Sequence, residues 1–140
     1  MGRIAGVDMG SKRLGFALSD PDQFLASGKE VVVLESPDQA ANAIEHFCRE
    51  HQVERLVMGL PVNMDGSRGP AVKKVEEVAE RLRKRMDIPV VFWDERLTTK
   101  AAHGFMIEAG TRREKRRDLV DKVAAQLILQ GYLDSLGPQG

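Results

Sequence analysis

Two short apolar segments near the start of the chain, separated by a tight turn, constrain the fold more than any other feature. The first segment stops at Asp8, Gly10 follows two residues later, and the second segment begins at Leu14. Glycines stand where the backbone must bend or be approached closely, so this stretch predicts two strands joined by a turn. Asp8 then ends a strand inside the sheet. It is either a metal ligand or phosphate-site acid, or a turn residue that caps its own backbone.

The composition predicts one domain, residues 1–140, with a single substantial core. The 21 basic and 21 acidic residues balance, so a polyanionic partner would have to be held by a local basic surface. One cysteine, Cys48, excludes a disulfide framework within the chain, fits a reducing cytoplasm and is expected to fill the core. The histidines lack zinc-site spacing, and no apolar run is long enough to cross a membrane. We therefore expect a soluble, cytoplasmic protein without a membrane partner.

Strand and helix patterns alternate along the rest of the chain. The predicted order is strands at 3–8, 13–19 and 29–35, a helix from Ser36 to His51, a strand at 53–60, a helix from Pro70 to Met86, a strand at 89–93, a short helix from Thr98 or Thr99 to Gly110, and a last helix at 118–136. Three successive strands indicate an antiparallel meander, whereas a strand, a helix and a strand indicate parallel pairing. The sum is an α/β fold, a mixed five-stranded sheet with helices on both faces.

Several buried positions follow from the same patterns. The β-branched run at 31–34 is expected to be buried on both faces of the sheet. The last helix is expected to bury Val120, Val123, Ala124, Leu127 and Ile128. We interpret the many basic residues of the helix at 70–86 as a solvated surface, and Phe92 and Trp93 as packing residues and not as platforms for bases.

Acidic residues occupy positions that such a fold could bring together. Asp8 ends the first strand, Asp94 and Glu95 stand at the end of the fifth, and Asp121 lies near the apolar stripe of the last helix. Clustered carboxylates repel one another, and hard divalent cations such as Mg²⁺ or Mn²⁺, which prefer oxygen ligands, relieve that repulsion. Two such ions can activate water and stabilise the departing oxygen in phosphodiester cleavage. Aspartates are nevertheless common at strand ends, so the spacing alone also fits a purely structural role.

Four motifs, in order and with compatible gaps, resemble the YqgF (RuvX) family over nearly the whole chain. They are Val-Asp-Met-Gly-Ser-Lys-Arg-Leu-Gly at 7–15, Gly-Leu-Pro-Val-Asn-Met-Asp-Gly at 59–66, Asp-Glu-Arg-Leu-Thr-Thr at 94–99 and Val-Asp-Lys-Val-Ala-Ala-Gln-Leu-Ile-Leu at 120–129. The resemblance implies a ribonuclease-H-like, three-layer fold and a bacterial, cytoplasmic nuclease. Members of the family are described as Holliday junction resolvases and as nucleases that trim the 5′ end of precursor 16S ribosomal RNA.

The resemblance also implies a metal site for Mg²⁺ or Mn²⁺ made by Asp8, Glu95 and Asp121. Adjacent strand residues point to opposite faces, so we favour Glu95 over Asp94 as the acid that faces the site. We interpret Asp118 as an outer acid or a helix cap, and Asp65 as a turn former. One departure is that the fourth strand ends in Gly-Leu-Pro at 59–61, without the acid that ribonuclease-H-like folds often carry there.

Basic residues beside these acids are expected to hold the nucleic acid through its phosphates. They are Lys12, Arg13, Arg96, Arg112, Arg113, Lys115, Arg116 and Arg117. We expect the segment 111–117 to be a mobile phosphate clamp, and the protein to be a monomer or a weak homodimer. Two other function classes stay open: a non-catalytic nucleic-acid-binding domain of the same fold, and an ATPase of the sugar-kinase or actin type, which needs two such domains.

Overall fold

The computed structural model describes residues 2–10, 12–34, 36–95 and 113–136, with the backbone alone for Pro37 and for residues 113–121. The elements follow the chain in a simple order. They are β1 (Arg3–Met9), β2 (Arg13–Ser19), β3 (Ala26–Val33), α1 (Pro37–Glu50), β4 (Val53–Leu60), α2 (Pro70–Arg85), β5 (Val90–Asp94) and α4 (Arg113–Ser135). The short helix predicted between Thr98 and Gly110 falls outside the described residues.

The strands form one five-stranded sheet in the order β3-β2-β1-β4-β5. β1 pairs antiparallel with β2, and β2 antiparallel with β3, whereas β1, β4 and β5 run parallel. The carboxyl ends of the three parallel strands therefore meet at one edge of the sheet, which is where open α/β sheets bind ligands. The predicted mixed sheet is confirmed.

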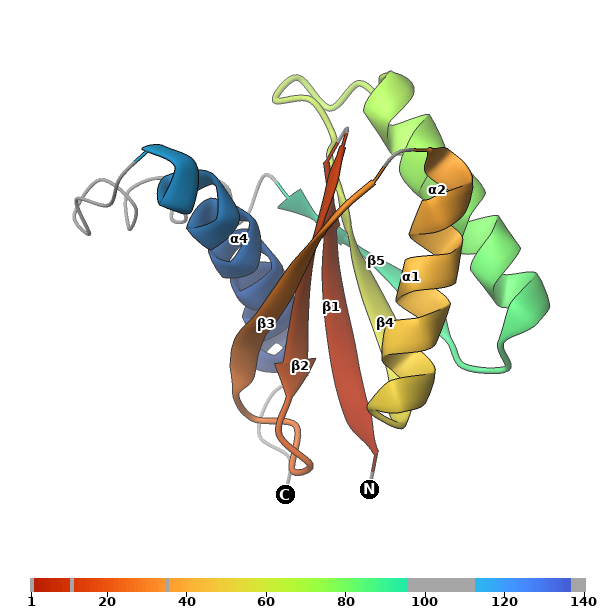
Figure 1. Ribbon diagram of the computed structural model, residues 1–140, viewed down its shortest axis with the longest axis vertical. Helices are drawn as coiled ribbons and strands as arrows, with labels where there is room; N and C mark the ends of the chain where they lie inside the picture. The colour runs from red at the N-terminus through yellow and green to blue at the C-terminus, as the bar shows by residue number, and fades with distance from the viewer. Residues whose placement is uncertain (1, 11, 35, 96–112, 137–140) are drawn as a thin grey trace.

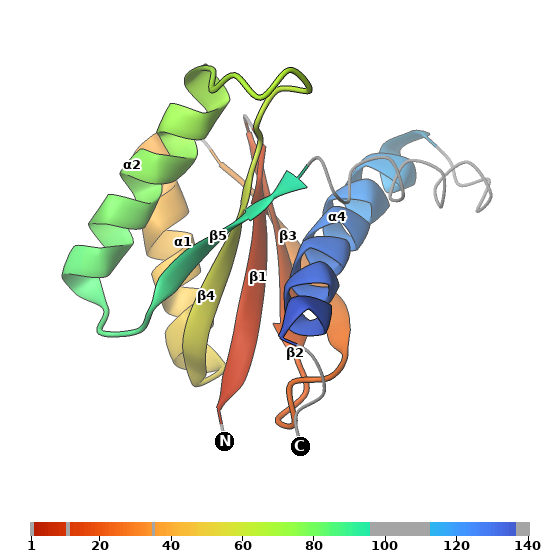
Figure 2. The same cartoon turned by 180° about the vertical axis from the view of Figure 1, so that it is seen from behind.

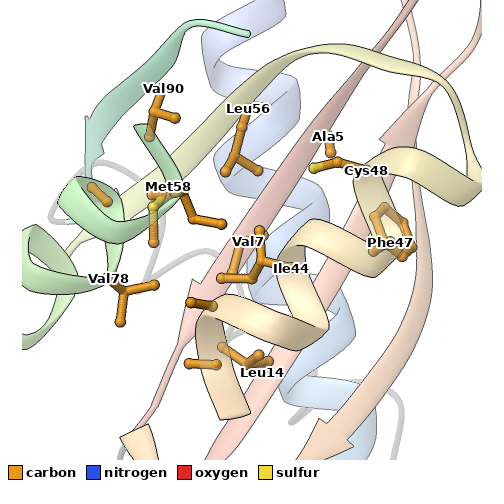
Figure 3. Packing of buried hydrophobic residues seen from close by; sticks show 14 of the residues in the cluster. Ala5, Val7, Leu14, Ile44, Phe47, Cys48, Leu56, Met58, Val78 and Val90 are labelled. Carbon is orange, nitrogen blue, oxygen red and sulfur yellow. The ribbon is translucent and has the colours of Figure 1, made fainter. Parts of the chain in front are cut away.

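Helices cover both faces of this sheet, in three layers (Figures 1 and 2). α1 and α2 lie side by side on one face, and α4 crosses the other. The core between the sheet and α1 and α2 contains Phe47, Ile44, Leu56 and Met58 (Figure 3). Phe16 belongs to the same core, and all five side chains are essentially inaccessible to solvent. Cys48 belongs to this core, as predicted, and burial raises the pKa of its thiol to about 12.

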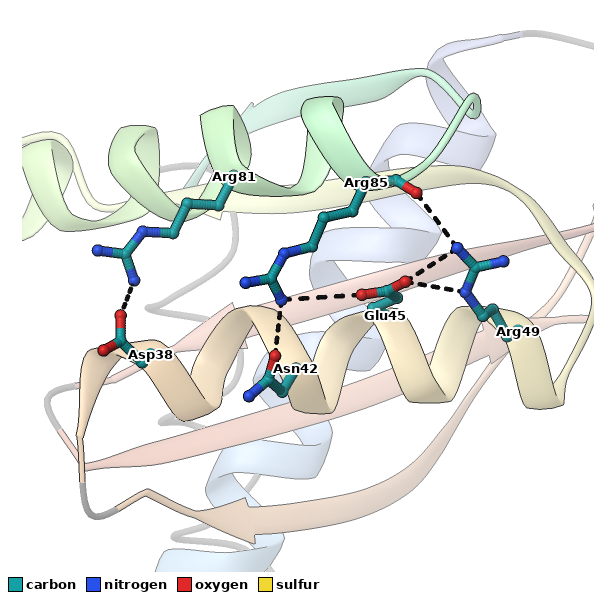
Figure 4. A network of polar contacts seen from close by, with 6 residues as sticks. All are labelled: Asp38, Asn42, Glu45, Arg49, Arg81 and Arg85. Carbon is teal, nitrogen blue, oxygen red and sulfur yellow. Dashed lines mark hydrogen bonds and ion pairs between the residues drawn. The ribbon is translucent and has the colours of Figure 1, made fainter.

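A chain of polar contacts joins the outer surfaces of α1 and α2 (Figure 4). Arg81 pairs with Asp38 in the first turn of α1, and Arg85 donates to Asn42 and lies 3.7 Å from Glu45. Two of the basic side chains of α2, Arg81 and Arg85, are therefore held by polar side chains of α1. This agrees with their interpretation as a helix surface. Ser36 precedes α1 as predicted, although its side chain makes no capping hydrogen bond.

On the other face, α4 packs closely against β1 because β1 carries a glycine at the contact. A Cβ placed on Gly6 would lie 2.7 Å from Cβ of Leu129, closer than real side chains approach. Leu129 and its neighbour Ile128 are fully buried there, together with Ala125. No helix in the described part of the chain has the length and apolar character needed to cross a membrane.

Two predictions about these elements are wrong. The strand predicted at 29–35 begins earlier, at Ala26, and it is an edge strand whose Val33 is 65% exposed, so it is not buried on both faces. The last helix begins at Arg113 and not at residue 118, and its buried residues include Ala125 and Leu129, whereas Ala124 and Leu127 are only partly buried.

Candidate active site

Asp8 occupies the penultimate position of β1, on the face of the sheet that α4 covers. Ile4 belongs to the apolar cluster on that face and Gly6 contacts α4, so alternation along the strand places Asp8 on the same side. The turn after Asp8 is closed by the backbone, because the N–H of Gly10 donates to the carbonyl of Arg13 at 2.8 Å. This closure leaves the carboxylate of Asp8 facing the neighbouring strand ends.

Glu95 follows the last residue of β5, and its side chain reaches back over β4 to Asp8. The carboxyl group of Glu95 is hydrogen-bonded to Asp8. The strand between them carries Gly59 at this level, where it pairs with Trp93 of β5. A Cβ on Gly59 would lie 2.9 Å from Cγ of Glu95 and 3.1 Å from its Cδ. The side chain of Glu95 therefore fills the space directly above Gly59.

The electrostatics of this pair follow from its burial. The pKa of Glu95 is raised to about 9, first by its burial and then by its hydrogen bond to Asp8 and by the negative charges of Asp8 and Asp94. At neutral pH, in the absence of a cation, Glu95 therefore keeps its proton and donates the hydrogen bond to Asp8.

Such a pair has the chemistry of a site for a hard divalent cation. Ionising both carboxyl groups at this distance requires positive charge beside them, and carboxylate oxygens are the ligands that Mg²⁺ and Mn²⁺ prefer. Among the side chains that the structure describes, no three His, Cys, Asp or Glu residues converge. The third predicted ligand, Asp121, lies in α4, but its side chain is outside the described residues.

Residues 92–95 point alternately to the two faces of the sheet, as expected for a strand. Phe92 packs against the core of α1 and α2, whereas Trp93 packs on the α4 side. Glu95, two residues after Trp93, shares its face, and it is Glu95 that contacts Asp8. Trp93 covers Gly131 of α4 and meets Tyr132 edge to face, with ring centroids 6.4 Å apart, so it is a packing residue.

The other predicted site residues lie away from the Asp8–Glu95 pair or outside the described residues. Asp65 accepts hydrogen bonds from the backbone N–H and the hydroxyl of Ser67, at 2.9 and 2.6 Å, so it is a turn former. Asp118 lies inside α4, and so it does not cap that helix. Lys12 and Arg13 belong to the turn and to the start of β2. Arg113, Lys115, Arg116 and Arg117 lie in the first turns of α4, with side chains outside the described residues, and Arg96 and Arg112 lie outside them altogether.

Residues 2–135 match the family model described as "RuvX: Holliday junction resolvase". The chain belongs to the RuvX family. A relative from Syntrophomonas wolfei is 44% identical over 137 residues, 96% of this chain and 97% of its own length, and one from Clostridium tetani is 45% identical over 134 residues, 96% and 97%. Both carry the name "Putative pre-16S rRNA nuclease". Membership of RuvX, a family of nucleases, confirms that the chain is an enzyme.

Solved structures identify the fold of this RuvX protein. A Thermus thermophilus RuvC in complex with Holliday junction substrate superposes with a TM-score of 0.63 at 14% identity, over 98% of this chain and 97% of that one. The fowlpox virus resolvase in its Holliday junction complex gives 0.57 at 12% identity, over 97% and 99%. The fold is therefore ribonuclease-H-like, as the motifs implied.

The sequence interpretation missed the role of Gly59 in this RuvX site. In the sequence, the Gly-Leu-Pro end of β4 stood out only as a departure, without the acid that is often found there. In the structure, the same glycine provides the space through which an acid from β5 reaches β1. A glycine in place of a side chain on a buried strand was the available signal, because it marks close approach by another group.

Proposed function

We propose that this RuvX protein is a divalent-metal-dependent nuclease of structured nucleic acid, in which Asp8, Glu95 and Asp121 hold Mg²⁺ or Mn²⁺. The observation that carries the proposal is the contact between Asp8 and Glu95 at the carboxyl edge of the sheet. Two acids that cannot both ionise unaided are a costly arrangement for a structural site, and their repulsion is relieved by a bound cation.

The divalent ion would supply Lewis-acid chemistry for phosphodiester hydrolysis, with water as the nucleophile. The contribution of the chain is to position the ligands and the substrate. Glu95 would be a ligand in its ionised form, because positive charge beside the pair would stabilise both carboxylates and lower the pKa of Glu95. Lys12 and Arg13, in the adjoining turn, are placed to contact substrate phosphates, and such contacts position the backbone without reading its sequence.

We propose that the substrate is the 5′ end of precursor 16S ribosomal RNA, a four-way DNA junction, or both, in the bacterial cytoplasm. The names of the relatives support the first substrate and the description of the family supports the second. The match of one family model to residues 2–135 is consistent with a single domain. We propose that this domain acts as a monomer or a weak homodimer.

The test is cleavage of both substrates with Mg²⁺ or Mn²⁺, by the wild type and by Asp8→Asn. The asparagine keeps the shape of the side chain and removes its charge, so we expect metal-dependent cleavage to fall by about 10²-fold or more while the far-ultraviolet circular dichroism stays unchanged. Cleavage near the wild-type rate by a folded Asp8→Asn protein would refute the metal mechanism.

A second candidate is a non-catalytic nucleic-acid-binding domain. It is the function that a chain of this fold would keep if the Asp8–Glu95 pair took up no cation. Calorimetric titration with Mn²⁺ separates the two functions. A wild-type protein that binds nucleic acid but neither takes up Mn²⁺ nor cleaves either substrate is a binding module.

A further inference from the structure

A pocket lies at the same edge of the sheet as the Asp8–Glu95 pair, but on the opposite face, under α1 and α2. Its volume is about 350 Å³, near the lower end of the range for small-ligand pockets and enough for one small organic ligand. It is bounded by the turn between β1 and β2, the start of α1 and the middle of α2. Figure 1 shows that this turn and the start of α1 lie at one end of the sheet.

The lining of the pocket combines an apolar floor with a cationic rim. The floor is formed by Met9, Leu34, Ala40 and Val78. The rim carries Lys12, Lys74 and Arg81, with one carboxylate, Glu77, and the polar Ser36 and Gly10. A flat apolar group with a negatively charged substituent matches this combination better than an inorganic anion, which needs no apolar floor.

Two of the three cations have no ionic partner among the side chains that the structure describes. Arg81 is held by Asp38 (Figure 4). Within the described part of the chain, neither Lys12 nor Lys74 forms an ion pair, and both are exposed. A backbone hydrogen bond of 2.7 Å from the N–H of Leu34 to the carbonyl of Lys12 fixes the turn against the floor. The two lysines are thus available for an anionic group at the mouth of the pocket.

We propose that this pocket binds one nucleotide of the nucleic-acid strand, with the base on the floor and the phosphate at Lys12 and Lys74. The proposal rests on the proposed function, because it adds a subsite to the same nuclease. Asp8 and Met9 are adjacent in β1 and point to opposite faces, toward the carboxylate pair and toward the pocket. A strand that crosses the sheet edge at the turn therefore places one phosphate near Asp8 and a flanking nucleotide in the pocket.

The first test is titration of the full chain with adenosine 5′-monophosphate, without divalent metal, followed by amide chemical shifts. We expect saturable shifts at Gly10, Ala40, Lys74 and Val78, and weaker binding of adenosine and of inorganic phosphate. Phosphate binding as tight as that of the nucleotide would overturn the assignment of a base to the floor. The absence of shifts at these residues would overturn the site.

Charge reversal on α2 gives a matched pair of variants. Lys74 lines the pocket, whereas the adjacent Lys73 is equally exposed and does not. We expect Lys74→Glu to weaken binding of the nucleotide by about tenfold, the size of one lost charge-assisted hydrogen bond, and Lys73→Glu to leave it within about twofold. Equal effects of the two substitutions would mean that the nucleotide responds only to the overall charge of α2.

Competition then separates a nucleotide of the substrate from a free nucleotide. Displacement of adenosine 5′-monophosphate by a short oligonucleotide supports the subsite. Simultaneous binding of both ligands would overturn it in favour of a site for free nucleotides. All these measurements omit divalent metal and cleavage, so an inactive protein that binds the nucleotide contradicts the proposed function alone, and an active protein with an empty pocket contradicts this inference alone.

Discussion

The substitution Gly59→Ala tests whether the space above β4 is what brings Glu95 to Asp8. A methyl group on residue 59 would lie 2.6 Å from Cδ1 of Ile128 and 2.9 Å from Cγ of Glu95, where ordinary contacts begin at 3.4 Å. Ile128 belongs to α4 and is fully buried between this helix and the sheet, so it cannot withdraw into solvent. Glu95 follows the last residue of β5 and is only half-buried, so it is the side chain with more freedom to move.

The stability cost of this substitution is that of overpacking. Adding one methyl group to a close-packed interface costs about 1–3 kcal/mol. This part of the effect comes mainly from the approach to Ile128, the shorter of the two contacts. We therefore expect a lower melting temperature with the fold retained.

The effect on metal binding has a different origin. Displacing Glu95 separates its carboxyl group from Asp8, and changes of this kind around a metal ligand reduce affinity by about 10–100-fold. Calorimetric titration with Mn²⁺ at neutral pH measures this loss directly. Cleavage of the preferred substrate by Gly59→Ala at saturating metal then shows how much of the lost activity a higher metal concentration restores.

Two further variants separate the effects on stability and on the metal. Ile128→Val removes Cδ1, so combined with Gly59→Ala it should recover stability but not affinity for Mn²⁺. Gly131→Ala crowds the ring of Trp93 on the same face, at 3.1 Å, without contacting Glu95, and should leave the affinity unchanged. Wild-type affinity in Gly59→Ala would refute the argument that Gly59 positions Glu95.

Three other outcomes follow from the same structure. Glu95→Gln should abolish metal-dependent cleavage while Asp94→Asn keeps most of it; the reverse result in cleavage assays would exchange their roles. Because the pKa of Glu95 is raised from 4.5 to about 9, the metal-free folded chain binds more protons than the unfolded chain between these pH values, so its free energy of unfolding should fall as the pH rises through that range. Denaturant unfolding in a chelator should show that Glu95→Gln gains stability relative to the wild type as the pH rises; parallel pH profiles would contradict the shift. Replacing Lys115, Arg116 and Arg117 with alanine should flatten the salt dependence of nucleic-acid binding by about one unit of slope per lost phosphate contact, and an unchanged slope would show that they make none.

The elements whose ends carry local signals were predicted best from the sequence. β2 and β4 have the predicted limits, and α1 and α2 begin at the prolines that the pattern indicated. Strand alternation also favoured Glu95 over Asp94 as the acid on the side of Asp8, and Glu95 is the one in contact with Asp8, because the period of a strand depends only on its backbone.

The third strand shows what local pattern cannot supply. A run of three valines is typical of a strand covered on both sides, but β3 is the last strand of the sheet, and strand order is decided by long-range pairing. Nothing within residues 29–35 carries that information. Its extension to Ala26 likewise depends on the partner, Ser19 of β2.

The last helix was misjudged for two physical reasons. Arg, Lys and Glu are good helix formers, so the basic run continues the helix to Arg113 and does not precede it. The buried stripe is shifted because α4 approaches β1 at Gly6, where Leu129 and Ala125 make the contact. The helix has more leucines and alanines than one buried stripe can hold. The sequence pattern alone therefore does not show which of them contacts a glycine on a distant strand.

The two sides of the sheet are unequal in the described part of the chain. The apolar cluster under α1 and α2 has 21 buried members, whereas that under α4 has eight. Among the described residues, the candidate catalytic carboxylates lie on the α4 side, which has the fewer buried apolar members. Local opening is easiest where the fewest apolar contacts must be broken. We therefore expect the described part of α4 to separate from the sheet before α1 and α2 do.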